Sequence, residues 1–133
     1  MGTVVPNWTE DLAISGFDDA ALADAGTTAG DIDLATLTYD LVQVQITVVF
    51  TADAVLNAAT TLQVLYSSDS GGVDDTDPVT SVSIVKDTAA ASASTVTKSF
   101  VISNCAHARL SFLNSTGEAV NVSALMAGRN WTN

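Results

Sequence analysis

One short acidic segment carries residue types that could bind a metal ion. Residues 67–79 read SSDSGGVDDTDPV and contain Asp69, Asp74, Asp75 and Asp77. Calcium binds six to eight hard oxygens, which these carboxylates and the carbonyls of a loop can supply. However, their spacing lacks the alternating acids, central glycine and closing glutamate of an EF-hand. Because tight turns also require Asp and Gly, we predict an acidic turn between two strands without a cofactor, and bound Ca²⁺ is the alternative.

A second candidate is the pair formed by the single cysteine, Cys105, and the single histidine, His107. A spacing of two places both side chains on one face of a strand, as a nucleophile and its base would require. No oxyanion loop or orienting carboxylate is recognisable near them, and the sequence contains no phosphate loop or zinc motif. We therefore interpret Cys105 as a small core residue and predict that the chain is not an enzyme.

The composition limits the possible partners. The chain has 133 residues, 47% of them hydrophobic, and a formal net charge of -11. This length and hydrophobic content suit one core of ordinary size. The negative charge repels phosphate backbones and anionic lipid, so we predict neither nucleic acid nor a membrane as a partner. The first residues lack the basic and apolar regions of an export signal, and no apolar run is long enough to predict a membrane span.

Alternation of apolar and polar residues predicts that the chain is all-β. Residues 42–50 place Val and Ile on one face and Gln43, Gln45 and Thr47 on the other. Nothing resembles a crossover helix between parallel strands, so the fold class is an antiparallel β-sandwich of about seven to eight strands. A jelly-roll and an immunoglobulin-like topology both satisfy the pattern. The predicted strands lie within residues 26–36, 39–50, 61–68, 80–85, 94–103, 106–113 and 119–126.

Two shorter signals concern turns and asparagines. The segment NSTGE at 114–118 is typical of a tight turn and predicts a hairpin between the last two strands. Four Asn-x-Ser/Thr triplets begin at Asn7, Asn114, Asn121 and Asn130. We interpret these triplets as accidents of a Ser/Thr-rich chain, and we expect the four asparagines to face solvent.

The N-terminal residues differ from the rest because they contain apolar side chains without a regular period. We predict an N-terminal arm over residues 1–25, followed by the sandwich domain and a short C-terminal tail over residues 26–133. The arm either folds onto its own domain or lies on a neighbouring subunit. The candidate partner-binding residues are Trp8, Leu12, Ile14, Phe17 and, in the tail, Trp131.

A resemblance covers residues 26–126. The series GTTAGDIDLAT, VQVQITVVF, LQVLYSSDSGGVDDTDPVTSVSI and VTKSFVIS...ARLSFLNSTGEAVNVSALM resembles small β-sandwich virion proteins of tailed bacteriophages. In that group a strand ending in Tyr-Ser-Ser is followed by an Asp-Gly-Gly turn, an Asp-Thr-x-Pro step and a further strand. The resemblance implies a structural role on a virus particle that is assembled in the host cytoplasm.

Within that role, the first expectation is a capsid decoration or cement protein that contacts the major capsid protein or other virion proteins. The resemblance implies a homo-oligomer, with a trimer favoured at local three-fold axes of the shell. The alternative is a tail- or fibre-associated module that binds a receptor or carbohydrate, using Trp8, Trp131 or Tyr39 to stack on sugars.

Overall fold

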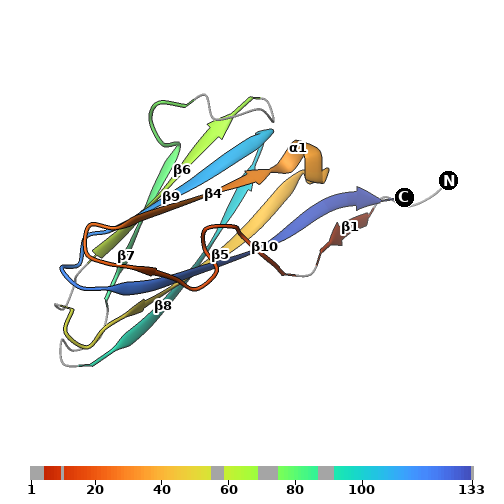
Figure 1. The fold of residues 1–133 in the computed structure, drawn as a ribbon. Helices are drawn as coiled ribbons and strands as arrows, with labels where there is room; N and C mark the ends of the chain where they lie inside the picture. Colours follow the sequence, from red (N-terminus) through yellow and green to blue (C-terminus); the bar gives the residue numbers. More distant parts are fainter. Residues whose placement is uncertain (1–4, 10, 55–58, 69–74, 87–91, 133) are drawn as a thin grey trace.

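A computed structural model describes residues 5–9, 11–54, 59–68, 75–86 and 92–132. The side chains of residues 5, 6, 131 and 132 lie outside this description. The chain forms two antiparallel sheets that pack face to face (Figure 1). The strands are β1 (Val5–Trp8), β2 (Leu12–Ala13), β3 (Ala20–Leu22), β4 (Thr27–Asp33), β5 (Leu41–Phe50), β6 (Ala59–Ser67), β7 (Thr80–Val85), β8 (Ser94–Ser103), β9 (His107–Asn114) and β10 (Val120–Thr132).

The strand order identifies the topology as a jelly roll. One sheet has the order β1-β10-β5-β8, and β2 and β3 also pair with β10. The other sheet has the order β4-β9-β6-β7. If β1, β2 and β3 are taken as one interrupted strand, eight strands pass between the two sheets in the pattern of two Greek keys. The all-β sandwich prediction is confirmed, and the strand order favours the jelly roll over the immunoglobulin-like alternative.

The core lies between the two sheets and follows the alternation seen in the sequence. The inward side chains of β5 are all fully buried, while Gln43 and Gln45 are exposed on the opposite face. Phe17 and Phe112 meet edge to face, with ring centroids 6.4 Å apart. Such contacts between the sheets hold the sandwich together. The inward residues of β5 are Val42, Val44, Ile46, Val48 and Phe50.

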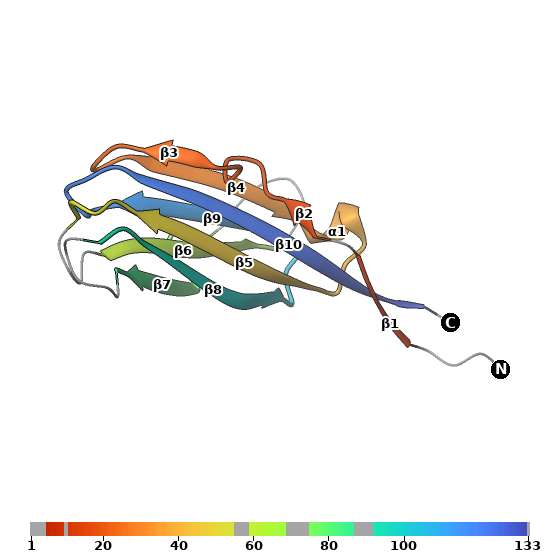
Figure 2. The ribbon, with the colours of Figure 1, turned by 90° about the horizontal axis from the view of Figure 1, so that it is seen from below.

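β1, β2 and β3 lie one after another along one edge of β10 (Figure 2). β3 pairs with residues 120–122, β2 with residues 125–126 and β1 with residues 129–132, whereas β5 occupies the opposite edge. Gly16 makes the turn between β2 and β3, with φ +88, and a Cβ there would overlap the carbonyl of Ala29. The described part of the arm therefore folds onto its own domain.

Two local predictions are wrong. The strand predicted over residues 26–36 ends at Asp33, and the short helix α1 (Leu34–Leu37) follows because the Asp33 carboxylate accepts a hydrogen bond from the backbone N–H of Thr36, 3.0 Å away. The turn after Asn114 does not form a hairpin, because β9 and β10 belong to different sheets. No helix in the described part of the chain is long and apolar enough to cross a membrane.

Candidate functional site

A two-stranded ribbon extends from one end of the sandwich. β10 pairs with β5 only up to Arg129, so the residues beyond it pair with β1 alone. We call β1 and residues 129–132 the terminal ribbon. Figure 2 shows that it extends past the other strands and carries both chain ends. An isolated pair of strands is marginally stable in water. The stability of the terminal ribbon therefore depends on side-chain contacts where it joins the sandwich.

Those contacts fix one aromatic side chain. The guanidinium carbon of Arg129 lies 5.7 Å from the ring centroid of Trp8, within cation-π range. Arg129 Nη2 donates to Asp40 Oδ2 at 2.9 Å, and this hydrogen bond raises the pKa of the guanidinium. Asp40 in turn donates its backbone N–H to the carbonyl of Arg129 at 2.9 Å. Trp8 is thereby held in place while 46% of its surface stays exposed.

The other four predicted partner-binding residues differ in their exposure. Leu12 is 40% exposed at the edge of the sheet next to β10. Ile14 and Phe17 are 2% and 0% exposed and belong to the core, so the structure contradicts their proposed role as contact residues. The turn at Gly16 interrupts the strand between β2 and β3, and both side chains lie between the sheets. The side chain of Trp131 lies outside the description, although its backbone pairs with β1.

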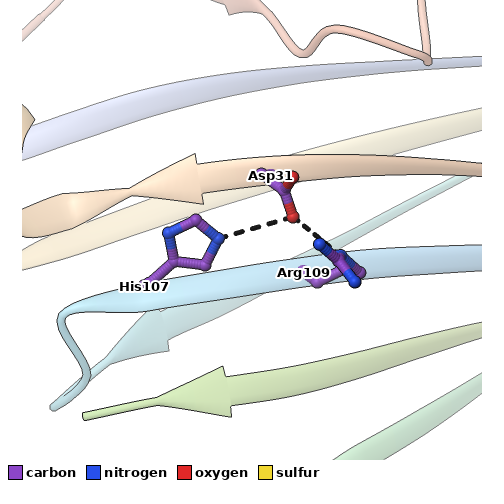
Figure 3. A network of polar contacts seen from close by, with 3 residues as sticks. All are labelled: Asp31, His107 and Arg109. Atoms are coloured by element: carbon purple, nitrogen blue, oxygen red, sulfur yellow. Dashed lines mark hydrogen bonds and ion pairs between the residues drawn. The ribbon is translucent and has the colours of Figure 1, made fainter. Parts of the chain in front are cut away.

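A charged cluster lies on the outer face of the second sheet (Figure 3). Asp31 on β4 faces Arg109 on β9, and Arg109 Nε donates to Asp31 Oδ1 at 2.8 Å. This hydrogen bond lowers the pKa of Asp31 below its usual value. His107 Nε2 lies 3.4 Å from the same oxygen, within ion-pair distance but without hydrogen-bond geometry, and both ring nitrogens are buried. The cluster joins β4 to β9 by a cross-strand pair.

The Cys105 and His107 side chains have different surroundings. β9 begins only at His107, and Asn104 has a left-handed φ of 61, so the strand alternation does not extend back to Cys105. The thiol packs against the core, and its pKa is raised first by burial and then by the nearby charge of Asp75. A raised pKa keeps the thiol protonated and weakly nucleophilic, which supports the interpretation of Cys105 as a packing residue.

A polar hollow of about 640 Å³ lies beside Cys105 at the end of the sandwich where β6 and β9 meet. The carboxylate of Asp75 accepts a hydrogen bond from the backbone N–H of Tyr66 at 2.7 Å. One oxygen of a predicted calcium ligand is therefore already engaged by the backbone. The hollow is lined by Tyr66, Ser67, Ser68, Asp75, Asn104, Cys105 and Ala106.

The calcium alternative stays a prediction. Asp69 and Asp74 fall outside the described residues, and Asp77 is exposed. In the part of the chain that the structure describes, no three His, Cys, Asp or Glu side chains form a group that could hold a metal ion.

No protein-family model and no curated protein sequence matches the chain. Solved structures do match its fold. The VP2 subviral particle protein of infectious bursal disease virus has a TM-score of 0.52 at 15% identity, over 93% of this chain and 32% of VP2. A family 35 carbohydrate-binding module (CBM35) from Cellvibrio japonicus Abf62 has a TM-score of 0.49 at 12% identity, over 93% and 99%. PorU from Porphyromonas gingivalis has a TM-score of 0.48 at 16% identity, and the chain spans 13% of it.

At 15% identity, the likeness to VP2 indicates a shared fold and nothing more. Folds of this kind support many unrelated functions, so the function has to be argued from surfaces and residues.

Proposed function

We propose that the chain is a non-enzymatic structural protein of a bacteriophage virion, a decoration protein that binds the capsid surface and stabilises the shell. The observation that carries this proposal is the exposed Trp8 on the terminal ribbon, held there by Arg129 and Asp40. Aromatic side chains that are fixed before binding lose little conformational entropy and are frequent anchors of protein interfaces. The resemblance to phage virion proteins supports the same role.

The charge of the chain also supports this proposal. A decoration protein is present in many copies and has to remain unaggregated until it binds. A net charge of -11 keeps free copies apart in solution. The jelly roll is compatible with this role, and it provides a compact body from which the terminal ribbon reaches the shell.

The size of the Trp8 contribution can be estimated. About half of its surface is exposed, or about 100 Å² of a large aromatic side chain. Complete burial of that area against a capsid protein contributes about 2.5 kcal/mol, or roughly 50- to 100-fold in affinity. Leu12, at the neighbouring edge, adds a smaller apolar contact.

Co-sedimentation with empty capsids of the phage that carries this chain tests the proposal. We expect Trp8→Ala to weaken binding by roughly 50-fold, whereas Leu113→Ala, which removes a comparably exposed apolar residue from the far sheet, should leave binding unchanged. Point variants are preferable to deletion of residues 1–16, because the deletion would also remove Ile14 from the core. Undiminished binding by Trp8→Ala would reject the terminal ribbon as the anchor.

The alternative function is a tail- or fibre-associated module that binds carbohydrate. The polar hollow beside Cys105 favours it, because Tyr66, Asp75 and Asn104 offer hydrogen-bonding groups that suit sugar hydroxyls. Of the suggested stacking residues, Trp8 is exposed but has Arg129 over its ring, and Tyr39 packs against Gly128. A glycan-array signal that is lost on Asn104→Ala and kept on Trp8→Ala would favour this alternative.

A further inference from the structure

A small hollow lies on the outer face of the sheet where β2, β10 and β5 run side by side (Figure 2). Its volume is about 140 Å³, well below the roughly 300 to 1,000 Å³ of a typical small-molecule pocket, so it suits a single side chain. Because β2 and β5 occupy opposite edges of β10, Asp11, directly before β2, lines one side of the hollow. Gln43 and Gln45 of β5 line the other side, and Leu125 and Ala127 of β10 lie between.

The groups that line the hollow match the chemistry of a lysine side chain. An ammonium has three donors and no acceptor, and the hollow offers the carboxylate of Asp11 and the amide oxygens of Gln43 and Gln45 as acceptors. Leu125 and Ala127 provide apolar surface for the four-carbon stem. The guanidinium of arginine is broader and pairs with a carboxylate through two parallel hydrogen bonds, which leaves the glutamine oxygens unused.

Asp11 has no ion-pair partner in the part of the chain that the structure describes. None of the hydrogen bonds and ion pairs among those residues engages its carboxylate. The four basic side chains of the protein make contacts elsewhere: Lys86 with three loop carbonyls, Lys98 with the carbonyl of Ser83, Arg109 with Asp31, and Arg129 with Asp40. A cation for this hollow therefore has to come from a partner, and the net charge of -11 favours a partner surface of opposite sign.

The hollow is continuous with the surface assigned to capsid binding. Leu125, Ala127 and Arg129 alternate along β10, so they point to the same outer face at intervals of about 7 Å. Arg129 is paired with Trp8 in the strand register and lies over its ring. Because a standard interface covers about 800 Å² on each partner, a protein surface that buries Trp8 also reaches the hollow.

We propose that this hollow receives a lysine side chain of the capsid protein to which the terminal ribbon binds. The lysine contact rests on the proposed capsid role and names the chemistry of the partner. Since an ion pair at the edge of an interface is screened by salt, binding to capsids should weaken as the NaCl concentration rises. Burial of Trp8 alone would not produce this dependence, because apolar contacts do not weaken with added salt.

The first test uses the folded chain with n-butylammonium, which has the stem and charge of a lysine side chain. The side-chain NH2 signals of Gln43 and Gln45 in nitrogen-15 NMR spectra report on the hollow. We expect saturable shifts of both signals with a millimolar dissociation constant, as for an exposed ion pair. Asp11→Asn should weaken this binding at least about fivefold, and n-butanol, which has the stem without the charge, should leave both signals in place.

Asp18→Asn is the matched control, because Asp18 is also exposed and the change in charge is the same. This variant should bind n-butylammonium at the hollow like the wild type. Glutamine signals that do not move with n-butylammonium, or that move equally in the Asp11→Asn variant, would overturn the proposed lysine contact.

The second test is co-sedimentation with empty capsids at low and high NaCl. Asp11→Asn should weaken binding about tenfold and reduce its salt dependence, because the covered lysine loses its counter-charge, whereas Asp18→Asn should bind like the wild type. Equal binding by the wild type and Asp11→Asn would overturn the lysine contact and leave the capsid role intact. A wild-type chain that does not bind capsids would instead overturn the proposed function, and with it the capsid protein as the source of the lysine.

Discussion

Replacement of Asn114 by alanine should destabilise the fold strongly. Asn114 ends β9 and is 0% exposed. Its side-chain NH2 donates to the carbonyls of Leu22, Ala23 and Glu118 at 3.2, 3.0 and 2.8 Å. Its side-chain oxygen accepts from the backbone N–H and the hydroxyl of Thr116 at 3.1 and 2.8 Å. One amide therefore connects the β3–β4 turn to the β9–β10 turn.

The magnitude follows from these contacts. The two hydrogen bonds from Thr116 are buried, and loss of each costs about 1 kcal/mol. The three carbonyls are partly buried, so water can replace part of each lost bond, at about 0.5 kcal/mol each. We expect Asn114→Ala to lower the free energy of unfolding by about 3 to 4 kcal/mol, which is a large fraction of the 5 to 15 kcal/mol typical of a domain.

Urea unfolding and calorimetry measure this loss, and the expected fall in Tm is about 10 to 15 °C. Asn121→Ala is the control, because Asn121 is exposed and its side chain contacts Asp19 at 3.3 Å. Its effect should stay within about 0.5 kcal/mol. A double-mutant cycle with Thr116→Val should give a coupling of about 1 kcal/mol. Equal destabilisation by the Asn114 and Asn121 variants would refute the reasoning.

Three further predictions concern other groups. Lys86 is fully buried, and its Nζ donates to three loop carbonyls at 2.8 to 3.3 Å. Lys86→Met should therefore lower the free energy of unfolding, measured in urea, by about 2 to 3 kcal/mol. The control Lys98→Met, at an exposed position, should lower it by less than about 0.5 kcal/mol. Arg109 lowers the pKa of Asp31, so this ion pair stabilises the fold at pH values above the unfolded pKa of the carboxyl, and the stabilisation is lost as the pH falls. In an NMR titration, Arg109→Gln should raise the pKa of Asp31. An unchanged pKa would contradict Arg109 as the cause. Burial raises the pKa of Cys105, so its reaction with a disulfide reagent at pH 8 should be slower than that of a free-cysteine peptide, and an equal rate would contradict the burial argument.

Much of the fold follows from the alternation of residues, because inward and outward positions have period two in a strand. The same alternation could have identified two buried polar residues. Asn114 continues the inward series of Leu110 and Phe112, and Lys86 continues that of Ile84. Asn114 was expected to face solvent, and this prediction is wrong because the turns at the end of the sandwich cover it.

Other features depend on contacts between distant segments, which local patterns do not encode. The choice of jelly roll depends on which strands pair with one another within each sheet. The burial of Ile14 and Phe17 follows from the pairing of residues 12–22 with β10, about 100 residues later in the chain. The Arg129 contacts that hold Trp8 bring three separate segments together. For these reasons the sequence identified Trp8 as a candidate but gave no sign of what fixes it.

The position of the chain on the virus particle tests the proposed function most directly. Negative-stain imaging of phage particles, with gold-labelled antibody against this chain, shows where it lies. The decoration model predicts label distributed over the capsid surface, and it predicts that particles carrying the Trp8→Ala variant lose most of that label. Label confined to tail tips, or absent from intact particles, would contradict the proposed capsid role.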